Sequence, residues 1–184
     1  MPIVELHLME GYGAEEKRRL ATGLANAVRS VIPAAPEAVT VMLNEVARDG
    51  YFRDGPREPA PALPDPTDTV RAFLAAMEQR DLNAAQAHLG EGFTMRFPGT
   101  APMTELADLI AWSKPRYRFV TKSFEGFDTV SGADGSVVYC RGTLSGEWPD
   151  GSAFSGIRFI DRFELAGGKI TRQDVWNDIA EVRG

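Results

Sequence analysis

The sequence predicts an α+β fold in two modules: a small strand–helix–strand module, and then a larger module in which helices precede an antiparallel sheet. Three observations predict it. Near the start, the hydrophobic spacing changes from alternation to a helical period and back. Five prolines fall within residues 53–66. Beyond residue 117, alternating strands are separated by strong turn sequences, and helices followed by such a meander indicate an α+β module.

The first module is predicted from its spacing. Residues 3–9 alternate as a strand does, and residues 14–32 place Leu20, Leu24 and Val28 at helical intervals behind two acidic residues in the first turn. Residues 39–46 form the second strand. A unit of this kind has parallel strands joined by a right-handed crossover. Because so short a module buries little surface alone, we expect oligomer contacts or the second module to cover it.

The prolines indicate a linker. Proline interrupts helices and central strands and favours an extended spacer. We therefore divide the chain into residues 1–55, a linker at 56–65, and a second module at 66–184.

The second module is predicted to begin with helices. Thr67 or Asp68 is expected to cap the first, and a short helix over 82–88 is expected to break at Gly90–Gly92. A strand over 93–99 and a helix over 104–112, with Thr104 as its cap, come next. Strands are then expected over 117–130 (bent at Gly126), 136–148, 152–165 and 170–179, with hairpin turns at 149–151 and 166–169.

Composition excludes several classes of function. The net charge of −6 argues against nucleic-acid binding, which needs a basic face. No apolar run approaches the ~18 residues of a membrane helix, and no signal peptide is visible. The single cysteine, Cys140, excludes an internal disulfide and favours a cytoplasmic location. Its place in a strand predicts a core or edge residue, with a nucleophile as the alternative. No cluster of side chains has metal-ligand spacing, and we expect no cofactor.

Pro2 is the first candidate for chemistry. A small residue after the initiator methionine usually means that the methionine is removed, which would make Pro2 a terminal secondary amine. Burial disfavours the charged form of an amine, so such a group can act as a base near neutral pH. The alternative is that proline simply often follows methionine.

Residues 2–55 resemble the 4-oxalocrotonate tautomerase family. The resemblance is carried by residues 2–11 (PIVELHLMEG), the helix opening at 14–17 (AEEK) and the second strand at 39–45 (VTVMLNE). It implies that Pro2 is the catalytic base and that the protein forms a homo-oligomer. The two positions where the family holds substrate-binding arginines are here Tyr12 and Thr40, which implies a neutral or monoanionic substrate. The family's pocket aromatic corresponds to Tyr51 or Phe52.

Residues 66–182 resemble the SnoaL-like group, which has the cone-shaped fold of nuclear transport factor, ketosteroid isomerase and scytalone dehydratase. The resemblance is carried by the turn at 97–99 (FPG), by DRFEL at 161–165, and by GKI at 168–170 with DVWND at 174–178. It implies a ligand pocket on the concave side of the sheet. This fold serves enzymes, binding proteins and dimerisation modules alike.

The strand over 156–165 shows one charge on an apolar face. Ile157, Phe159, Phe163 and Leu165 share that face with Asp161. Residues 170, 172, 174, 176 and 178 are expected to share a face in the last strand. Carboxyls in an apolar pocket serve as general acids or bases, so Asp161 and Asp178 are the candidate acid/base pair. The alternative is that Asp161 pairs with an arginine such as Arg141 or Arg158.

The pocket of the second module is expected to be lined by aromatic side chains, namely Trp112, Tyr117 and Trp176. We predict an enzyme for keto–enol tautomerisation or related proton transfer α to a carbonyl of a small molecule. One alternative is a polyketide-type cyclase, hydratase or hydroxylase that uses only the second module. Another is a non-enzymatic protein that binds an apolar metabolite and oligomerises.

Overall fold

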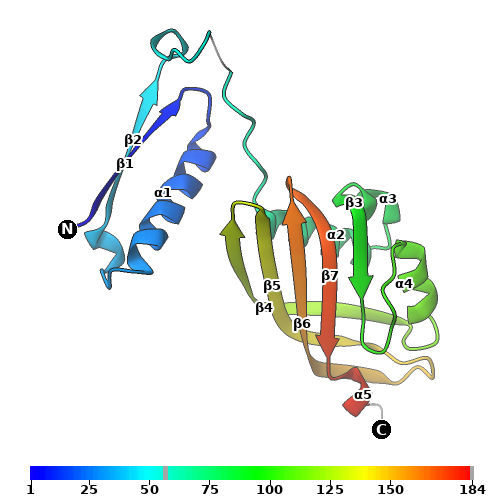
Figure 1. Ribbon diagram of the computed structural model, residues 1–184. Helices are drawn as coiled ribbons and strands as arrows, with labels where there is room; N and C mark the ends of the chain where they lie inside the picture. The colour runs from blue at the N-terminus through cyan, green and yellow to red at the C-terminus, as the bar shows by residue number, and fades with distance from the viewer. Residues whose placement is uncertain (56–57, 183–184) are drawn as a thin grey trace. The chain divides into compact units, whose positions relative to one another are not determined.

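A computed structural model describes residues 1–55 and 58–182, and the chain divides into two units, Met1–Ala62 and Leu63–Gly184. Each unit is described by itself. Residues 58–65 carry neither helix nor strand (Figure 1). Pro56 and Arg57, the first two residues of the predicted linker, lie outside the described residues.

The first unit is the predicted strand–helix–strand module. Strand β1 (Ile3–Met9), helix α1 (Ala14–Arg29) and strand β2 (Thr40–Val46) follow one another, with short 3-10 turns at Pro36–Ala38 and Arg48–Gly50. The strands are parallel and in register from Ile3↔Thr40 to Met9↔Val46. Helix α1 lies along one face of this sheet (Figure 1). It ends three residues earlier than predicted, where Ser30 forms the C-cap ahead of Pro33.

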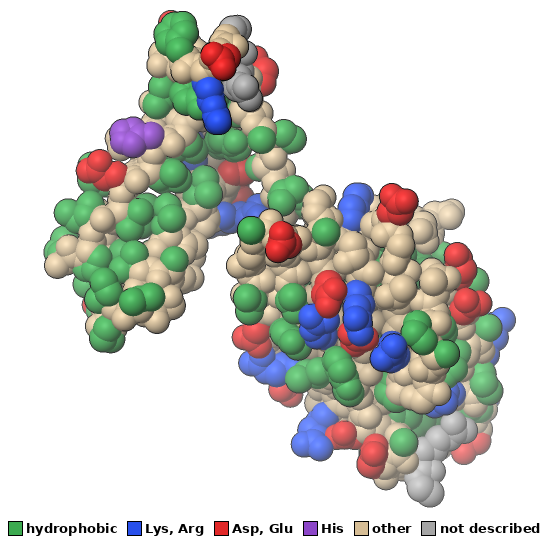
Figure 2. All heavy atoms as spheres, in the orientation of Figure 1, with side chains coloured by type: hydrophobic (Ala, Val, Ile, Leu, Met, Phe, Trp, Pro, Cys, Tyr) green, Lys and Arg blue, Asp and Glu red, His purple; other side chains and the backbone are tan. Residues whose placement is uncertain are grey.

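No described side chain of the first unit is buried. Large apolar side chains are open to solvent, including Ile3 at the start of β1, Met42 within β2 and Val31 just beyond α1, the last 82% exposed. Hydrophobic side chains cover much of the face of this unit that Figure 2 shows. A module of this size therefore lacks an interior of its own, as its length predicts.

The second unit confirms the α+β prediction. Its helices are α2 (Pro66–Glu78), α3 (Leu82–Gln86), α4 (Leu106–Ser113) and α5 (Ile179–Val182); its strands are β3 (Leu89–Arg96), β4 (Phe119–Gly132), β5 (Gly135–Glu147), β6 (Ala153–Ala166) and β7 (Lys169–Asn177). The sheet order is β3-β7-β6-β5-β4. Strands β4 to β7 form the predicted antiparallel meander, whereas β3 pairs with β7 in parallel. The sheet curves around the helices (Figure 1).

Three local predictions are wrong. Helix α2 is capped by Asp65, whose side chain accepts a hydrogen bond from the Thr67 amide, and not by Thr67 or Asp68. Glu105 precedes α4 without a side-chain hydrogen bond, so Thr104 is not its cap. The glycines at 90 and 92 lie within β3, because the strand begins at Leu89 rather than at 93.

The core lies between the helices and the inner face of the sheet. Phe73 of α2 contacts Phe163 edge-on at 6.0 Å, and Val138 and Ile170 are buried with them. The alternation predicted for β6 is confirmed, because positions 157, 159, 161, 163 and 165 are all buried.

The last strand departs from its predicted alternation. The register with β6 shifts between Leu165↔Ile170 and Glu164↔Arg172, which leaves Thr171 as an extra residue. Such a bulge moves the following side chains to the opposite face. Gln173 therefore faces inward with Ile170, whereas Arg172 and Asp174 lie on the outer face.

Candidate functional site

The second unit contains a cavity of about 320 Å³ between α2, α4 and β4. This volume is at the small end of the range for ligand pockets, whose walls are mostly apolar with a few polar groups. Its walls include Leu74, Met77, Leu109 and Val120. Lys122 and Gln173 bring polar groups to these walls from β4 and β7, while Arg71, Glu78 and Arg80 reach the cavity from α2 and its C-terminal end.

An ion pair stands at this wall. The ammonium of Lys122 bonds Oδ2 of Asp161 on β6, and the side chains are 22% and 0% exposed. Lys122 Nζ also lies 4.1 Å from the centre of the Phe159 ring. The predicted partners of Asp161, Arg141 and Arg158, are not the ones that bind it. Lys122 contacts the cavity, whereas Asp161 lies behind it, so the lysine is the member of this pair that a ligand can contact.

Gln173 is the second group that holds Asp161. Its Nε2 donates to Asp161 Oδ2 at 3.4 Å, and the side chain is 3% exposed. Among the described residues, Gln173 Oε1 and Asp161 Oδ1 have no hydrogen-bond partner. An ionised carboxylate only accepts hydrogen bonds, so the amide nitrogen must face Asp161 and the amide oxygen must face away. A buried acceptor left without a hydrogen-bond partner is costly.

Two further titratable groups lie close by. Burial, and secondarily the charge of Asp161, raise the pKa of the Cys140 thiol to about 12. Cys140 is thus an inert core residue and not the alternative nucleophile. Burial also raises the pKa of Tyr117, against the opposing effect of its hydrogen bond with Ser113. Tyr117 lines the cavity, where the sequence placed it.

The structure does not bring the predicted acid/base pair together. Asp178 bonds Arg158 Nε at 2.6 Å, and Arg158 projects from the outer face of β6. Asp161 faces inward from the same strand. Asp178 is therefore separated from the cavity by the sheet. Trp176 is exposed on that outer face too, because the bulge at Thr171 reverses its direction.

Trp112 does not itself line the cavity. Its ring packs at a tilt of 53° against Phe97, which does line the cavity, with ring centres 5.4 Å apart. The Arg116 guanidinium lies over the Trp112 ring at 4.1 Å. The role of Trp112 is to support the wall.

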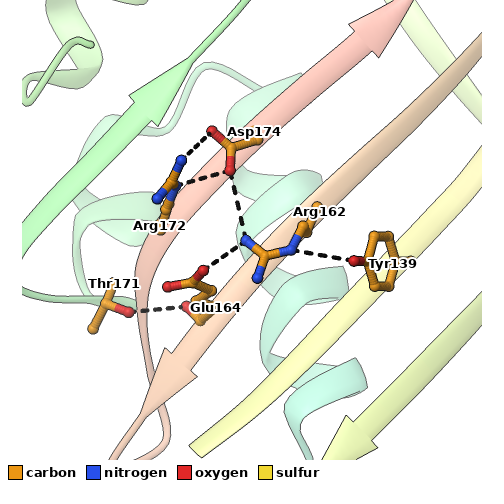
Figure 3. A network of polar contacts seen from close by, with 6 residues as sticks. All are labelled: Tyr139, Arg162, Glu164, Thr171, Arg172 and Asp174. Atoms are coloured by element: carbon orange, nitrogen blue, oxygen red, sulfur yellow. Dashed lines mark hydrogen bonds and ion pairs between the residues drawn. The ribbon is translucent and has the colours of Figure 1, made fainter.

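The outer face carries a polar network (Figure 3). Asp174 lies between Arg172 at 2.8 Å and Arg162 at 3.6 Å, and Arg162 Nε donates to the Tyr139 hydroxyl at 3.2 Å. The hydrogen bond with Glu164 raises the pKa of Arg162 further. These contacts link β5, β6 and β7 on the side away from the cavity.

The predicted site residues of the first unit lie at opposite ends of its sheet. Pro2 is half-buried, and its carbonyl accepts a hydrogen bond from the Thr40 amide at 3.0 Å. Tyr12 lies beyond the other end of β1, about 20 Å along the strand, where its hydroxyl donates to the Ala60 carbonyl at 2.9 Å. Tyr51 and Phe52 follow the same end of β2, and Phe52 is 85% exposed.

Sequence reasoning missed Lys122, Gln173 and Arg71. Lys122 is a single charge between Val120 and Phe124 in an alternating strand, the same signal that identified Asp161. Within residues 1–55 and 58–182, no three metal-binding side chains gather at one point. The same residues include no helix with the length and apolarity to cross a membrane.

Comparison with protein families finds two matches. A SnoaL-like domain model matches residues 70–173, and a model described as tautomerase enzyme matches residues 2–57. A Halalkalibacterium halodurans protein named "Probable tautomerase" is 40% identical over 57 residues, which are 31% of this chain and 93% of that protein. A Staphylococcus epidermidis protein of the same description is 34% identical over 58 residues, 32% and 95% of the two chains.

Solved structures resemble the second unit. An NTF2-like protein of unknown function from Burkholderia pseudomallei superposes with a TM-score of 0.55 at 16% identity, covering 65% of this chain and 95% of that one. TerC, crystallised with polyporic acid, gives a TM-score of 0.55 at 13% identity, covering 64% and 95%. At these identities the likeness concerns the fold alone.

Proposed function

We propose that this chain, which belongs to the SnoaL-like family through residues 70–173 and to the tautomerase family through residues 2–57, catalyses keto–enol tautomerisation of a small carbonyl compound. The membership itself makes the protein an enzyme of the isomerase or cyclase type, and so removes the non-enzymatic alternative. These families act on small molecules and are typically oligomeric. The base and the reaction are our proposal.

Pro2 is the proposed base. The observation that carries this is its place just before β1, where its carbonyl accepts a hydrogen bond from the Thr40 amide, within a segment 40% identical to a protein described as a probable tautomerase. After removal of Met1, the secondary amine takes a proton from the carbon α to the carbonyl, and an enolate forms. The amine then returns that proton to oxygen or to another carbon. One base thus completes the cycle without a cofactor.

The substrate is proposed to be neutral or monoanionic. Tyr12 and Thr40 occupy positions where the family has cationic side chains, and neither can neutralise a carboxylate. Arg48 lies nearby in the sequence but pairs with Glu58 at 2.7 Å. A dicarboxylate would therefore lose two ion pairs, whereas a keto acid or a ketone would lose fewer.

A homo-oligomer is part of the proposal. Pro2 and Tyr12 lie at opposite ends of the sheet, so a pocket that uses both requires a second copy of the chain. The exposed Ile3, Met42 and Val31 offer apolar surface for such contacts.

The decisive experiment is intact mass of the untagged protein, followed by ketonisation of enol-phenylpyruvate. We expect a mass without Met1, measurable ketonisation, and a loss of at least ~100-fold in kcat/KM in Pro2→Ala. Pro36→Ala, in a turn of the same unit, is the matched control and keeps its activity. Retention of Met1, or full activity of Pro2→Ala, would refute the role of Pro2.

A second candidate reaction is supported by the Lys122–Asp161 pair. In the cavity, the Lys122 ammonium would donate a hydrogen bond to the carbonyl oxygen of a ligand and so polarise that carbonyl group, as a cyclase requires. Asp161 would hold the lysine in place. Because the two sites belong to separate units, Pro2→Ala leaves this activity intact, whereas Lys122→Met/Asp161→Leu abolishes it. An activity that survives the double substitution but not Pro2→Ala assigns catalysis to the first unit alone.

A further inference from the structure

Three phenylalanines form an aromatic cluster at one end of the cavity in the second unit. Phe124 contacts Phe127 at 5.0 Å and Phe159 at 5.9 Å between ring centres. Two cations lie on this cluster: Lys122 over Phe159, and Arg71 over Phe127 at 3.7 Å. Both cations also line the cavity, as Phe124 does. Aromatic faces hold cations without neutralising them.

The charges at this end do not balance. Asp161 compensates Lys122, but within the described residues Arg71 makes no ion pair with a carboxylate. Glu78 also reaches the cavity, but it lies seven residues further along α2, about 10 Å away. Among the described residues, one positive charge, on the exposed Arg71, therefore remains without a carboxylate partner beside the cavity.

Gln173 adds a polar requirement of a different kind. Gln173 lines the cavity, and its amide oxygen is a buried acceptor without a hydrogen-bond partner among the described residues, so a ligand reaches it when the side chain turns toward the cavity. A ligand that satisfies it must carry a hydrogen-bond donor. A hydroxyl near an acidic group meets both requirements at once.

We propose that the Phe124 end of the cavity binds the carboxylate of a small hydroxy acid or enolic acid through Lys122 and Arg71, while Gln173 Oε1 accepts a hydrogen bond from its hydroxyl. The apolar remainder of the cavity holds the rest of the ligand. The enol of a 2-oxo acid carries both groups. The identification of the ligand as an enol rests on the proposed function. The binding site itself does not.

Three related compounds test the site without turnover. Phenyllactate carries the carboxylate and the hydroxyl, its methyl ester lacks the charge, and 3-phenylpropionate lacks the hydroxyl. Isothermal titration calorimetry of the full chain measures each affinity. We expect phenyllactate to bind at least about tenfold more tightly than either of the other two compounds, because each loses one charged or buried hydrogen bond.

Variants locate the binding. Arg71→Gln should weaken the binding of phenyllactate about tenfold and leave the binding of the methyl ester unchanged. Arg158→Gln, a matched change on the outer face of the sheet, should alter neither affinity. Arg71 is exposed, so its loss does not endanger folding. Gln173→Met should remove the advantage of phenyllactate over 3-phenylpropionate.

The proposal is overturned if phenyllactate fails to bind at millimolar concentration, if its ester binds equally well, or if Arg71→Gln behaves as Arg158→Gln does. Because none of these compounds is turned over by tautomerisation, such a failure leaves the Pro2 mechanism untouched. Conversely, loss of the Pro2 mechanism would not alter the three affinities.

Discussion

The first unit has no buried described side chain, whereas the second closes around Phe73, Phe163 and Ile170. The difference follows from length and topology, because two strands and a helix enclose too little surface, and five strands with covering helices enclose enough. The candidate sites differ in the same way. The cavity of the second unit is formed by residues of one chain, whereas the proposed Pro2 site would need residues that one chain places at opposite ends of its sheet.

Dilution is expected to produce the largest difference in stability between the two units. The first unit should lose its structure at low protein concentration. A fold that depends on contacts between copies of the chain becomes less stable when dilution separates the copies. All three tryptophans belong to the second unit, so their fluorescence follows that unit alone, while circular dichroism follows both. We expect the dichroism transition to shift to lower temperature on hundredfold dilution while the fluorescence transition stays in place. Transitions that coincide at every concentration would show that the units depend on one another.

A substitution in the core of the second unit is expected to have the next largest effect. Phe163→Ala should lower the free energy of unfolding of the second unit by about 3–5 kcal/mol, because Phe163 is fully buried and leaves a cavity. Phe52→Ala, the same change at an exposed site of the first unit, should alter stability by less than about 0.5 kcal/mol. Urea titration followed by tryptophan fluorescence measures the first change and circular dichroism the second. Equal effects would contradict the burial described here.

The smallest expected effect, over the first pH unit above about 8.5, is a pH dependence confined to the second unit. Folding raises the pKa of Cys140 to about 12, so the thiol stays protonated in the folded state where the unfolded chain already ionises it. Its contribution is complete below about pH 8.5 and is lost as pH rises toward 12, by at most about 1.4 kcal/mol per pH unit. Cys140→Val should flatten this alkaline slope. An identical slope in the variant would assign the titration to another group.

The sequence predicts best where local patterns are regular. The alternation over 157–165 and the helical spacing over 14–29 survive folding, because each follows from backbone geometry alone. The predicted alternation of side chains in β7 is wrong because one extra residue, Thr171, shifts the register. Nothing in the local sequence marks that bulge. The cap of α2 was missed because Asp65, Thr67 and Asp68 are all suitable cap residues, and tertiary structure decides among them.

The site follows the same rule. Asp161 was found because it is the odd residue in an apolar row. Its partner Lys122 is 39 residues away on β4, and β5 lies between their strands, so only the assembled sheet joins them. Asp178 was misplaced for the opposite reason, since its position depends on the bulge that precedes it.

The placement of Pro2 and Tyr12 at opposite ends of the β1–β2 sheet has a genetic consequence. If each pocket draws its base from one copy and its aromatic wall from another, two different inactive variants can repair each other when mixed. A chain without Pro2 and a chain without Tyr12 would then form some pockets in which both residues are intact. An inactive copy would equally inactivate the pockets that it shares with intact copies. Mutations in this short module would therefore behave as partly dominant.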